Sequence, residues 1–122
     1  MNKVISYRDL EVWRQSRTLA STIYQLTHDF PASEQFGITN QMRRAAVSIP
    51  SNIAEGFGRS TAKEKNQFYY TAKGSLAELE TQLYIACDVG YITDRMLQDT
   101  MDHASLTHRL LQGLIKANKE RL

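Results

Sequence analysis

The chain has 122 residues, of which 42% are hydrophobic and 23% charged, and its formal net charge is +2. This balance is typical of one globular domain and excludes an intrinsically disordered chain. Two prolines and six glycines are too few for a turn-rich β-sandwich or barrel, and no apolar run approaches the ~20 residues that span a membrane. Because there is one cysteine and no secretion signal, we expect a cytoplasmic protein with a single domain, residues 1–122, and no membrane partner.

The first predicted helix covers about residues 6–27, and the second covers about residues 39–57. The hydroxyl of Ser6 can cap the first helix together with Asp9, three residues on. Pro50 lies inside the second segment. Because proline has no N–H and its ring collides with the carbonyl four residues back, we expect a kink in this helix.

The third predicted helix covers about residues 61–89, opens with a Thr-x-x-Glu capping box and ends at Gly90. The fourth begins at Thr93 and Asp94 and runs to about residue 119. Four helices joined by short loops are typical of antiparallel neighbours. The sequence therefore predicts an all-α, antiparallel up-down-up-down four-helix bundle with a Pro-kinked second helix.

The apolar residues of each helix define the face that we expect to be buried when residues are placed at ~100° per position. On the first helix this core band is Leu10, Trp13, Ala20, Tyr24 and Thr27. On the third it is Phe68, Tyr69, Ala72, Leu76, Leu79, Leu83, Tyr84 and Ala86, and on the fourth it is Leu97, Met101, Ala104, Leu111, Leu114 and Ile115. These bands predict one shared interior.

A second set of apolar side chains lies away from the core bands, on regular helical spacing. A monomer rarely leaves such a patch in water, so we expect it to form an interface between copies of the chain. The alternative is that loops or terminal segments cover it. The predicted interface residues are Val12, Leu19, Leu26, Ile85, Leu106 and Leu110.

Basic residues gather in the first part of the chain, where residues 1–74 hold ten Lys and Arg against six Asp and Glu. Clustered cations indicate phosphate binding, although a solvated helix face can have the same composition. No zinc knuckle or RNP aromatic pair is present, so binding would be independent of sequence and sensitive to salt. The residues predicted to contact nucleic acid are Arg14, Arg17, Arg59, Lys63, Lys65 and Lys73.

Glu80 falls inside the core band of the third helix, where a lone carboxylate is costly. Arg43 or Arg44 on the second helix is the natural partner, because the planar guanidinium can hold a carboxylate with two hydrogen bonds. Glu55 could compete for the same arginine. We therefore predict an internal structural ion pair, which would withdraw one arginine from phosphate binding.

No set of residues suggests catalysis. The run Gly56-x-Gly58-x-Ser60 lacks the Gly-Lys-Ser/Thr ending of a phosphate loop and indicates helix termination instead. His103 and His108 are five residues apart and diverge around a helix, so they make a poor metal site. Since no nucleophile, base and orienting group come together, we expect no enzyme activity, no metal and no cofactor.

Several segments carry a resemblance to a known family. They are Tyr7–Trp13, Arg43–Ala45, Ser48–Arg59, Gly74–Gln82 and Gly90–Tyr91. With them the chain resembles the bacterial four-helix-bundle family of 23S rRNA intervening-sequence proteins, which includes the accessory variability determinant of diversity-generating retroelements. The resemblance implies a bundle that assembles into a ring-shaped homopentamer. The retroelement branch of this family binds nucleic acid and a reverse transcriptase, so the resemblance also implies partners of these two kinds.

Together these patterns predict a non-catalytic oligomeric scaffold that binds RNA or single-stranded DNA weakly and without sequence specificity, as an accessory to a nucleic-acid enzyme. The alternative is a protein-binding or structural homo-oligomer in which the basic residues are solvated and have no nucleic-acid role. Retention on RNA as a function of salt discriminates between the two, because phosphate binding weakens steeply as salt rises.

Overall fold

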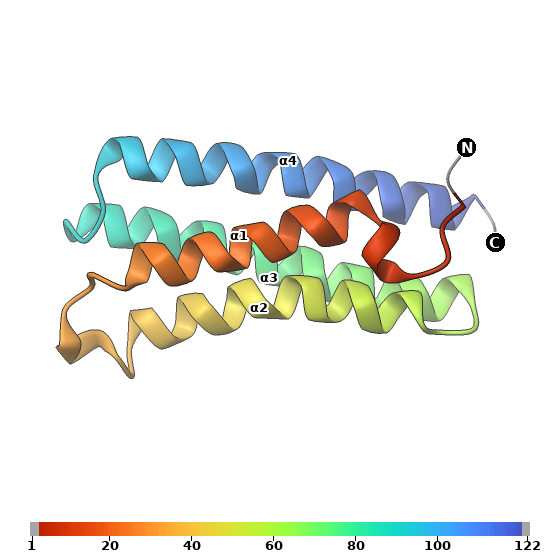
Figure 1. Ribbon diagram of the computed structural model, residues 1–122, viewed down its shortest axis with the longest axis horizontal. Helices are drawn as coiled ribbons and strands as arrows, with labels where there is room; N and C mark the ends of the chain where they lie inside the picture. The colour runs from red at the N-terminus through yellow and green to blue at the C-terminus, as the bar shows by residue number, and fades with distance from the viewer. Residues whose placement is uncertain (1–2, 121–122) are drawn as a thin grey trace.

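The computed structural model describes residues 3–120, which form four long helices packed side by side (Figure 1). The helices are α1 (Glu11–Thr27), α2 (Ile38–Phe57), α3 (Ala62–Asp88) and α4 (Asp94–Lys119). Two single-turn 3-10 helices precede α1 and α2, and they are η1 (Tyr7–Asp9) and η2 (Ala32–Glu34). The long helices therefore lie close to the positions predicted from the sequence.

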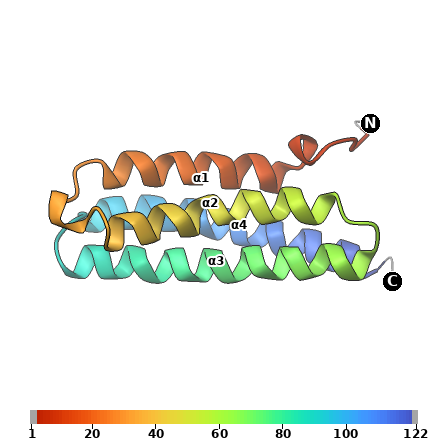
Figure 2. The same cartoon turned by 90° about the horizontal axis from the view of Figure 1, so that it is seen from below.

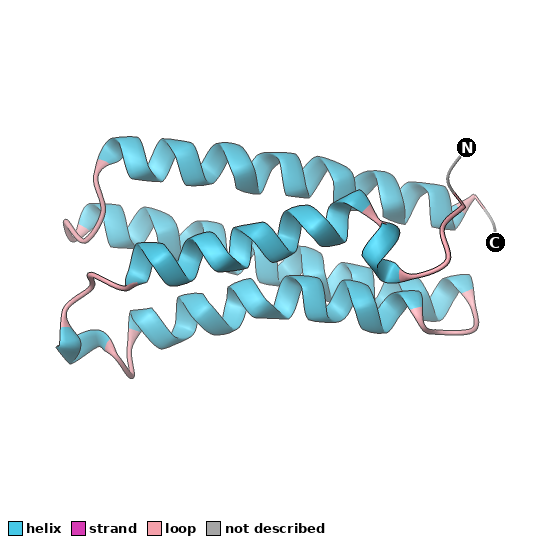
Figure 3. Cartoon of the chain, in the orientation of Figure 1, coloured by secondary structure: helices cyan, strands magenta, loops and turns pink. Residues whose placement is uncertain are grey.

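Each long helix packs against its neighbours in the chain, and α1 closes the bundle against α4 (Figures 1 and 2). The α1–α2 and α3–α4 connections share one end of the bundle, and the α2–α3 connection lies at the other (Figure 1). No strand occurs between residues 3 and 120 (Figure 3). The all-α, up-down-up-down bundle is thus confirmed.

The first predicted helix is split in two. Ser6 Oγ accepts a hydrogen bond from the backbone N–H of Arg8 at 3.2 Å, and Asp9 Oδ2 accepts one from the N–H of Ser6 at 3.0 Å. This capping box closes the single turn of η1. Leu10 then adopts an extended conformation, so α1 begins only at Glu11.

The other predicted helix ends are confirmed by local contacts. Thr61 Oγ1 accepts from the N–H of Glu64, and Thr93 Oγ1 accepts from the N–H of Met96, each at 3.1 Å. Gly90 follows α3 with a φ of 84°, in the left-handed region that favours glycine. Side-chain caps therefore begin α3 and α4, and a glycine turn separates them.

The buried face of α1 is wider than the predicted one. Of the predicted core band, Ala20 and Thr27 are buried and Leu10 and Trp13 pack against the core, whereas Tyr24 is 46% exposed. Val12 and Leu19, predicted at an interface between copies, are 4% and 0% exposed. Two apolar stripes about 100° apart therefore both face the interior, since Val12 and Trp13 are adjacent in the chain.

Two of the six residues predicted for the outer interface are consequently wrong, because Val12 and Leu19 are buried within one protomer. Leu26 and Leu110 pack against the core, as Val12 and Leu19 do, because the four helices pack together around one interior. Ile85 is 46% exposed and Leu106 is half-buried. Leu26 and Leu110 are also only half-buried, so the interface at these four positions stays a prediction.

The core bands of α3 and α4 are largely confirmed. Tyr84 is the exception, because it is 53% exposed. Phe68 on α3 and Leu97, Met101 and Leu114 on α4 are half-buried. The fully buried members are Tyr69, Ala72, Leu76, Leu79, Leu83 and Ala86 on α3, and Ala104, Leu111 and Ile115 on α4.

The α2–α3 pair is the most extensive helix contact, and Gly56 permits its close approach. A Cβ atom at Gly56 would lie 2.8 Å from Tyr69 Cε1 and 2.9 Å from Phe68 Cβ. Gly56 is buried inside α2, so its role is close packing and not the predicted termination; Gly58 caps the helix instead. Pro50 also lies within α2, and the kink that it predicts stays a prediction.

Candidate nucleic-acid interface

The basic residues predicted from the sequence do not share one surface. Arg14 is held by the turn before α1, since its Nη2 donates to the carbonyl of Asp9 at 2.9 Å and its Nε donates to the carbonyl of Arg8 at 3.1 Å. Its Nη1 also contacts Glu11 Oε2 at 3.3 Å. Arg14 therefore supports the chain at η1, and its charge is partly neutralised.

Two further predicted cations lie against aromatic rings near the α2–α3 connection. The Arg59 guanidinium lies 4.6 Å from the ring centroid of Phe68 and 3.8 Å from Glu55 Oε2. Lys65 Nζ donates to the carbonyl of Phe57 at 2.6 Å and lies 5.2 Å from that ring centroid. Both side chains are already engaged at the end of the bundle.

Arg17 and Lys63 are exposed and lie on different helices. Arg17 lies over the ring of Trp13 on α1, with its guanidinium carbon 5.6 Å from the centroid. Lys63 is in the first turn of α3.

Lys73 belongs to a different cluster, the α3–α4 lysine groove, which has a volume of about 320 Å³. Lys119 Nζ lies 5.4 Å from the ring centroid of Tyr70, whose side chain is 44% exposed. None of the described residues that line the groove is acidic, so its positive charge is not neutralised locally. The lining residues are Tyr70, Lys73, Gln112, Ile115, Lys116 and Lys119.

Lys116 and Lys119 could not be found from the count of charges along the chain, because they lie far from the basic block in sequence. Their spacing was nevertheless readable. Residues 112, 116 and 119 share one face of α4, as residues 70 and 73 share one face of α3, because positions three and four apart align on a helix. Antiparallel neighbours bring these two faces together.

The predicted internal ion pair is wrong. Arg43 Nε donates to Thr27 Oγ1 at 2.9 Å, and its guanidinium carbon lies 4.7 Å from the ring centroid of Tyr24 on α1. Arg44 is exposed. Among residues 3–120, Glu80 makes no ion pair; it lies at the edge of the core band and is half-buried, so water can solvate its carboxylate.

Glu55, the other predicted acidic partner, pairs with Arg59 one turn along its own segment, and both side chains are largely exposed. The ion pair was predicted because the whole arc around Leu76 was expected to be buried, whereas Glu80 on that arc is half-buried. Arg43 instead crosses from α2 to α1, where an aromatic face and a hydroxyl receive it without any carboxylate.

Two of the titratable side chains, Cys87 and His103, lie within hydrogen-bond distance of neighbouring polar groups. Cys87 Sγ donates to Asp94 Oδ1 at 3.3 Å, and this hydrogen bond raises the pKa of the thiol, which disfavours the nucleophilic thiolate. His103 Nε2 lies 3.1 Å from both the backbone and the side-chain oxygen of Gln15. In the described chain, no three or more His, Cys, Asp or Glu side chains gather closely enough to hold a metal ion.

None of the helices between residues 3 and 120 combines the length and the apolar character that a membrane span requires.

Comparisons with known proteins agree with the fold. The family model described as 23S rRNA-intervening sequence protein matches residues 8–113. A solved protein of unknown function from the S23 ribosomal protein family of Bacteroides thetaiotaomicron is similar, with a TM-score of 0.77 at 22% identity, over 86% of this chain and 98% of that one. A comparison with curated proteins gives no match. Since the family model spans most of its length, the chain belongs to the 23S rRNA-intervening sequence protein family.

Proposed function

We propose that this protein is a non-catalytic cytoplasmic scaffold that binds RNA or single-stranded DNA along the α3–α4 lysine groove. The observation that supports the proposal is the meeting of three lysines and one exposed tyrosine in a groove without acidic lining residues. Membership of a family linked to 23S rRNA intervening sequences supports an RNA-related role.

The chemistry of the groove fits a phosphate backbone better than a particular base sequence. Lysine ammonium groups act as flexible point charges, so Lys73, Lys116 and Lys119 can follow phosphates without fixed geometry. The exposed ring of Tyr70 offers a face on which any base can stack. Binding is therefore weak and independent of sequence, and three phosphate contacts give a salt slope of about −2 on a single strand.

The test compares two triple variants that remove equal charge. Lys73→Gln, Lys116→Gln and Lys119→Gln together empty the groove, whereas Arg17→Gln, Arg44→Gln and Lys63→Gln together remove cations scattered over exposed positions elsewhere. Fluorescence anisotropy of a labelled single-stranded RNA, measured from low to physiological salt, gives both affinity and salt slope. We expect the groove variant to lose about tenfold or more in affinity and the scattered variant to stay near wild type.

Equal weakening of the two variants would mean that binding is spread over the surface and would contradict the groove. Absence of binding by the wild-type protein at low salt would contradict nucleic-acid binding altogether. Circular dichroism of each variant, compared with wild type, checks that the helices are intact.

The scaffold role also includes self-association, for which exposed apolar side chains are the support. Tyr84, Ile85 and Val89 lie at the carboxyl end of the α3 region and are 53%, 46% and 56% exposed. Tyr24 and Val47, 46% and 42% exposed, line one shallow hollow between α1 and α2. Two different patches on one protomer are what a head-to-tail ring requires, because the first contacts the second on the next copy.

Light scattering coupled to size-exclusion chromatography tests the assembly at micromolar concentration. We expect a homo-oligomer, with a pentamer as the proposed size, and we expect Ile85→Lys or Val47→Lys to shift the mass toward the monomer. A monomeric wild-type protein would overturn the scaffold. If instead the protein assembles without binding RNA, the apolar patches favour the alternative function, a protein-binding or structural homo-oligomer.

A further inference from the structure

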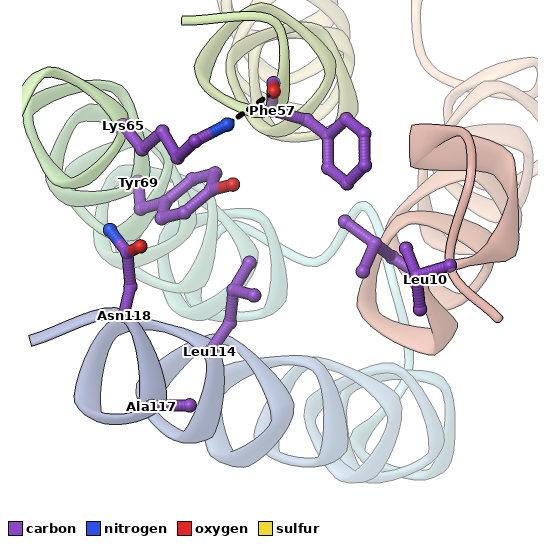
Figure 4. Close-up of a pocket in the computed structure, with 8 residues that line it drawn as sticks. Leu10, Phe57, Lys65, Tyr69, Leu114, Ala117 and Asn118 are labelled. Atoms are coloured by element: carbon purple, nitrogen blue, oxygen red, sulfur yellow. Dashed lines mark hydrogen bonds between the residues drawn. The ribbon is translucent and has the colours of Figure 1, made fainter. Parts of the chain in front are cut away.

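A hollow that is separate from the α3–α4 lysine groove lies at the end of the bundle where α2 ends and α3 begins (Figure 4). Its volume is about 300 Å³, within the range of small-molecule sites. Leu10, Phe57 and Leu114 provide apolar walls from three different segments. At this end α1 stops short of α3 and α4, because Leu10 is extended and α1 begins only at Glu11 (Figure 2).

The ammonium group of Lys65 is at one side of this hollow. Its Nζ donates to the Phe57 carbonyl at 2.6 Å, which uses one of its three N–H donors. The residue is half-buried, and no carboxylate between residues 3 and 120 pairs with it. A positive charge next to apolar walls, with donors to spare, is complementary to an anion that has an apolar body.

Tyr69 lies one turn further along α3, on the same face as Lys65. Its side chain is 2% exposed, and its hydroxyl points toward the hollow (Figure 4). Ala117 on α4 has a small side chain at the opposite wall, which leaves the space open. The polar groups therefore lie on one side of the hollow and the apolar groups surround the rest.

We propose that this hollow binds a medium-chain carboxylate, with its head group on Lys65 and its hydrocarbon chain against Leu10, Phe57 and Leu114. A monoanion fits best, because one ammonium group can balance one carboxylate but not a phosphate dianion. The site is separate from the α3–α4 lysine groove, whose lining residues it does not share. The inference therefore does not depend on nucleic-acid binding.

Isothermal titration of the full chain with octanoate and with 1-octanol tests the site, since these probes share their chain and differ in charge. We expect saturable octanoate binding that is tighter than octanol binding. Lys65→Met keeps the length of the side chain and removes its charge, so octanoate affinity falls about tenfold or more while octanol affinity is unchanged. Lys63→Met, two residues away and exposed, is the matched control and binds both probes like wild type.

Ala117→Phe fills the hollow from α4 and abolishes binding of both probes, which keeps the test decisive if Lys65→Met fails to fold. The proposal is overturned if wild-type protein gives no saturable octanoate binding, if octanol binds as tightly as octanoate, or if Lys65→Met binds octanoate like wild type. RNA anisotropy of folded Lys65→Met should match wild type, so a failure of this site and a failure of the lysine groove give different results.

Discussion

The two ends of the bundle are closed in different ways. At the end that holds the α1–α2 and α3–α4 connections, Phe30 is 8% exposed and its ring centroid lies 5.2 Å from that of Tyr91. The Tyr91 hydroxyl donates to Glu34 Oε2 at 2.8 Å, which ties the two connections together. At the other end, the side chains of Phe57, Lys65 and Leu114 surround a hollow.

The closed end therefore contributes to stability, whereas the open end holds the proposed binding site. At the closed end, aromatic packing fills the space, and the Glu34 carboxylate accepts a hydrogen bond from the neutral Tyr91 phenol. At the open end, the ammonium group of Lys65 contacts the carbonyl and the ring of Phe57, and no carboxylate between residues 3 and 120 pairs with it. Substitutions at the closed end should therefore alter the stability of the fold. Substitutions at the open end should alter either helix packing or the proposed binding.

The largest expected effect is at the closed end. Phe30→Ala removes a buried ring of the α1–α2 connection that packs against Tyr91 of the α3–α4 connection. We expect the free energy of unfolding to fall by about 3 kcal/mol. Urea unfolding followed by circular dichroism measures the change. Phe36→Ala is the matched control in the same connection, because Phe36 is 89% exposed and its loss should cost less than about 0.5 kcal/mol. Similar losses for both would mean that the closed end is not packed as described.

A smaller effect is expected near the open end from Gly56→Ala. The added Cβ would lie 2.8 Å from Tyr69 Cε1, so α2 and α3 must move apart, at a cost of about 1–3 kcal/mol. Gly113→Ala on α4 is the control, since its Cβ would meet nothing within 4 Å and alanine favours a helix by about 0.5–1 kcal/mol. Thermal melting should show opposite signs for the two variants; equal signs would contradict the close contact.

The smallest expected effect depends on pH. The hydrogen bond to Glu34 raises the pKa of Tyr91 above its ordinary value of 10.0, so the neutral phenol is favoured in the folded protein. Its contribution to stability is complete below pH 10 and is lost as the pH rises through the raised pKa. Wild type should be modestly more stable than Tyr91→Phe at about pH 8, and the difference should shrink at about pH 11. A difference that grows with pH would rule out this account.

The helix ends could be predicted because their signals are local. The side chains of Thr61 and Thr93 each cap a backbone N–H three residues on, and Gly90 adopts a backbone conformation that few other residues tolerate. The long apolar band of α3 was also readable, since it repeats over many turns. These features need no knowledge of what lies across the bundle.

The core face of α1 and the lysine groove could not be predicted in the same way. On α1 the stripes of Val12 and Trp13 both pack inward, and the width of that core face depends on the helices across the bundle. The groove joins Lys73 to Lys116, which lie on different helices far apart in the sequence. The carboxylate of Glu80 was assigned to the interior by its angle alone, although the residue is only half-buried.

A short polar contact between α2 and α3 fixes the axial position of one helix relative to the other. The hydroxyls of Ser48 and Ser75 lie 2.8 Å apart, and Asn52 Nδ2 donates to Ser48 Oγ at 2.9 Å. Displacing one helix by a single turn would separate the hydroxyls by about 5.4 Å, while alanines and leucines could find new apolar neighbours. The hydroxyl pair therefore selects one axial register for the bundle, which small apolar side chains alone would leave ambiguous.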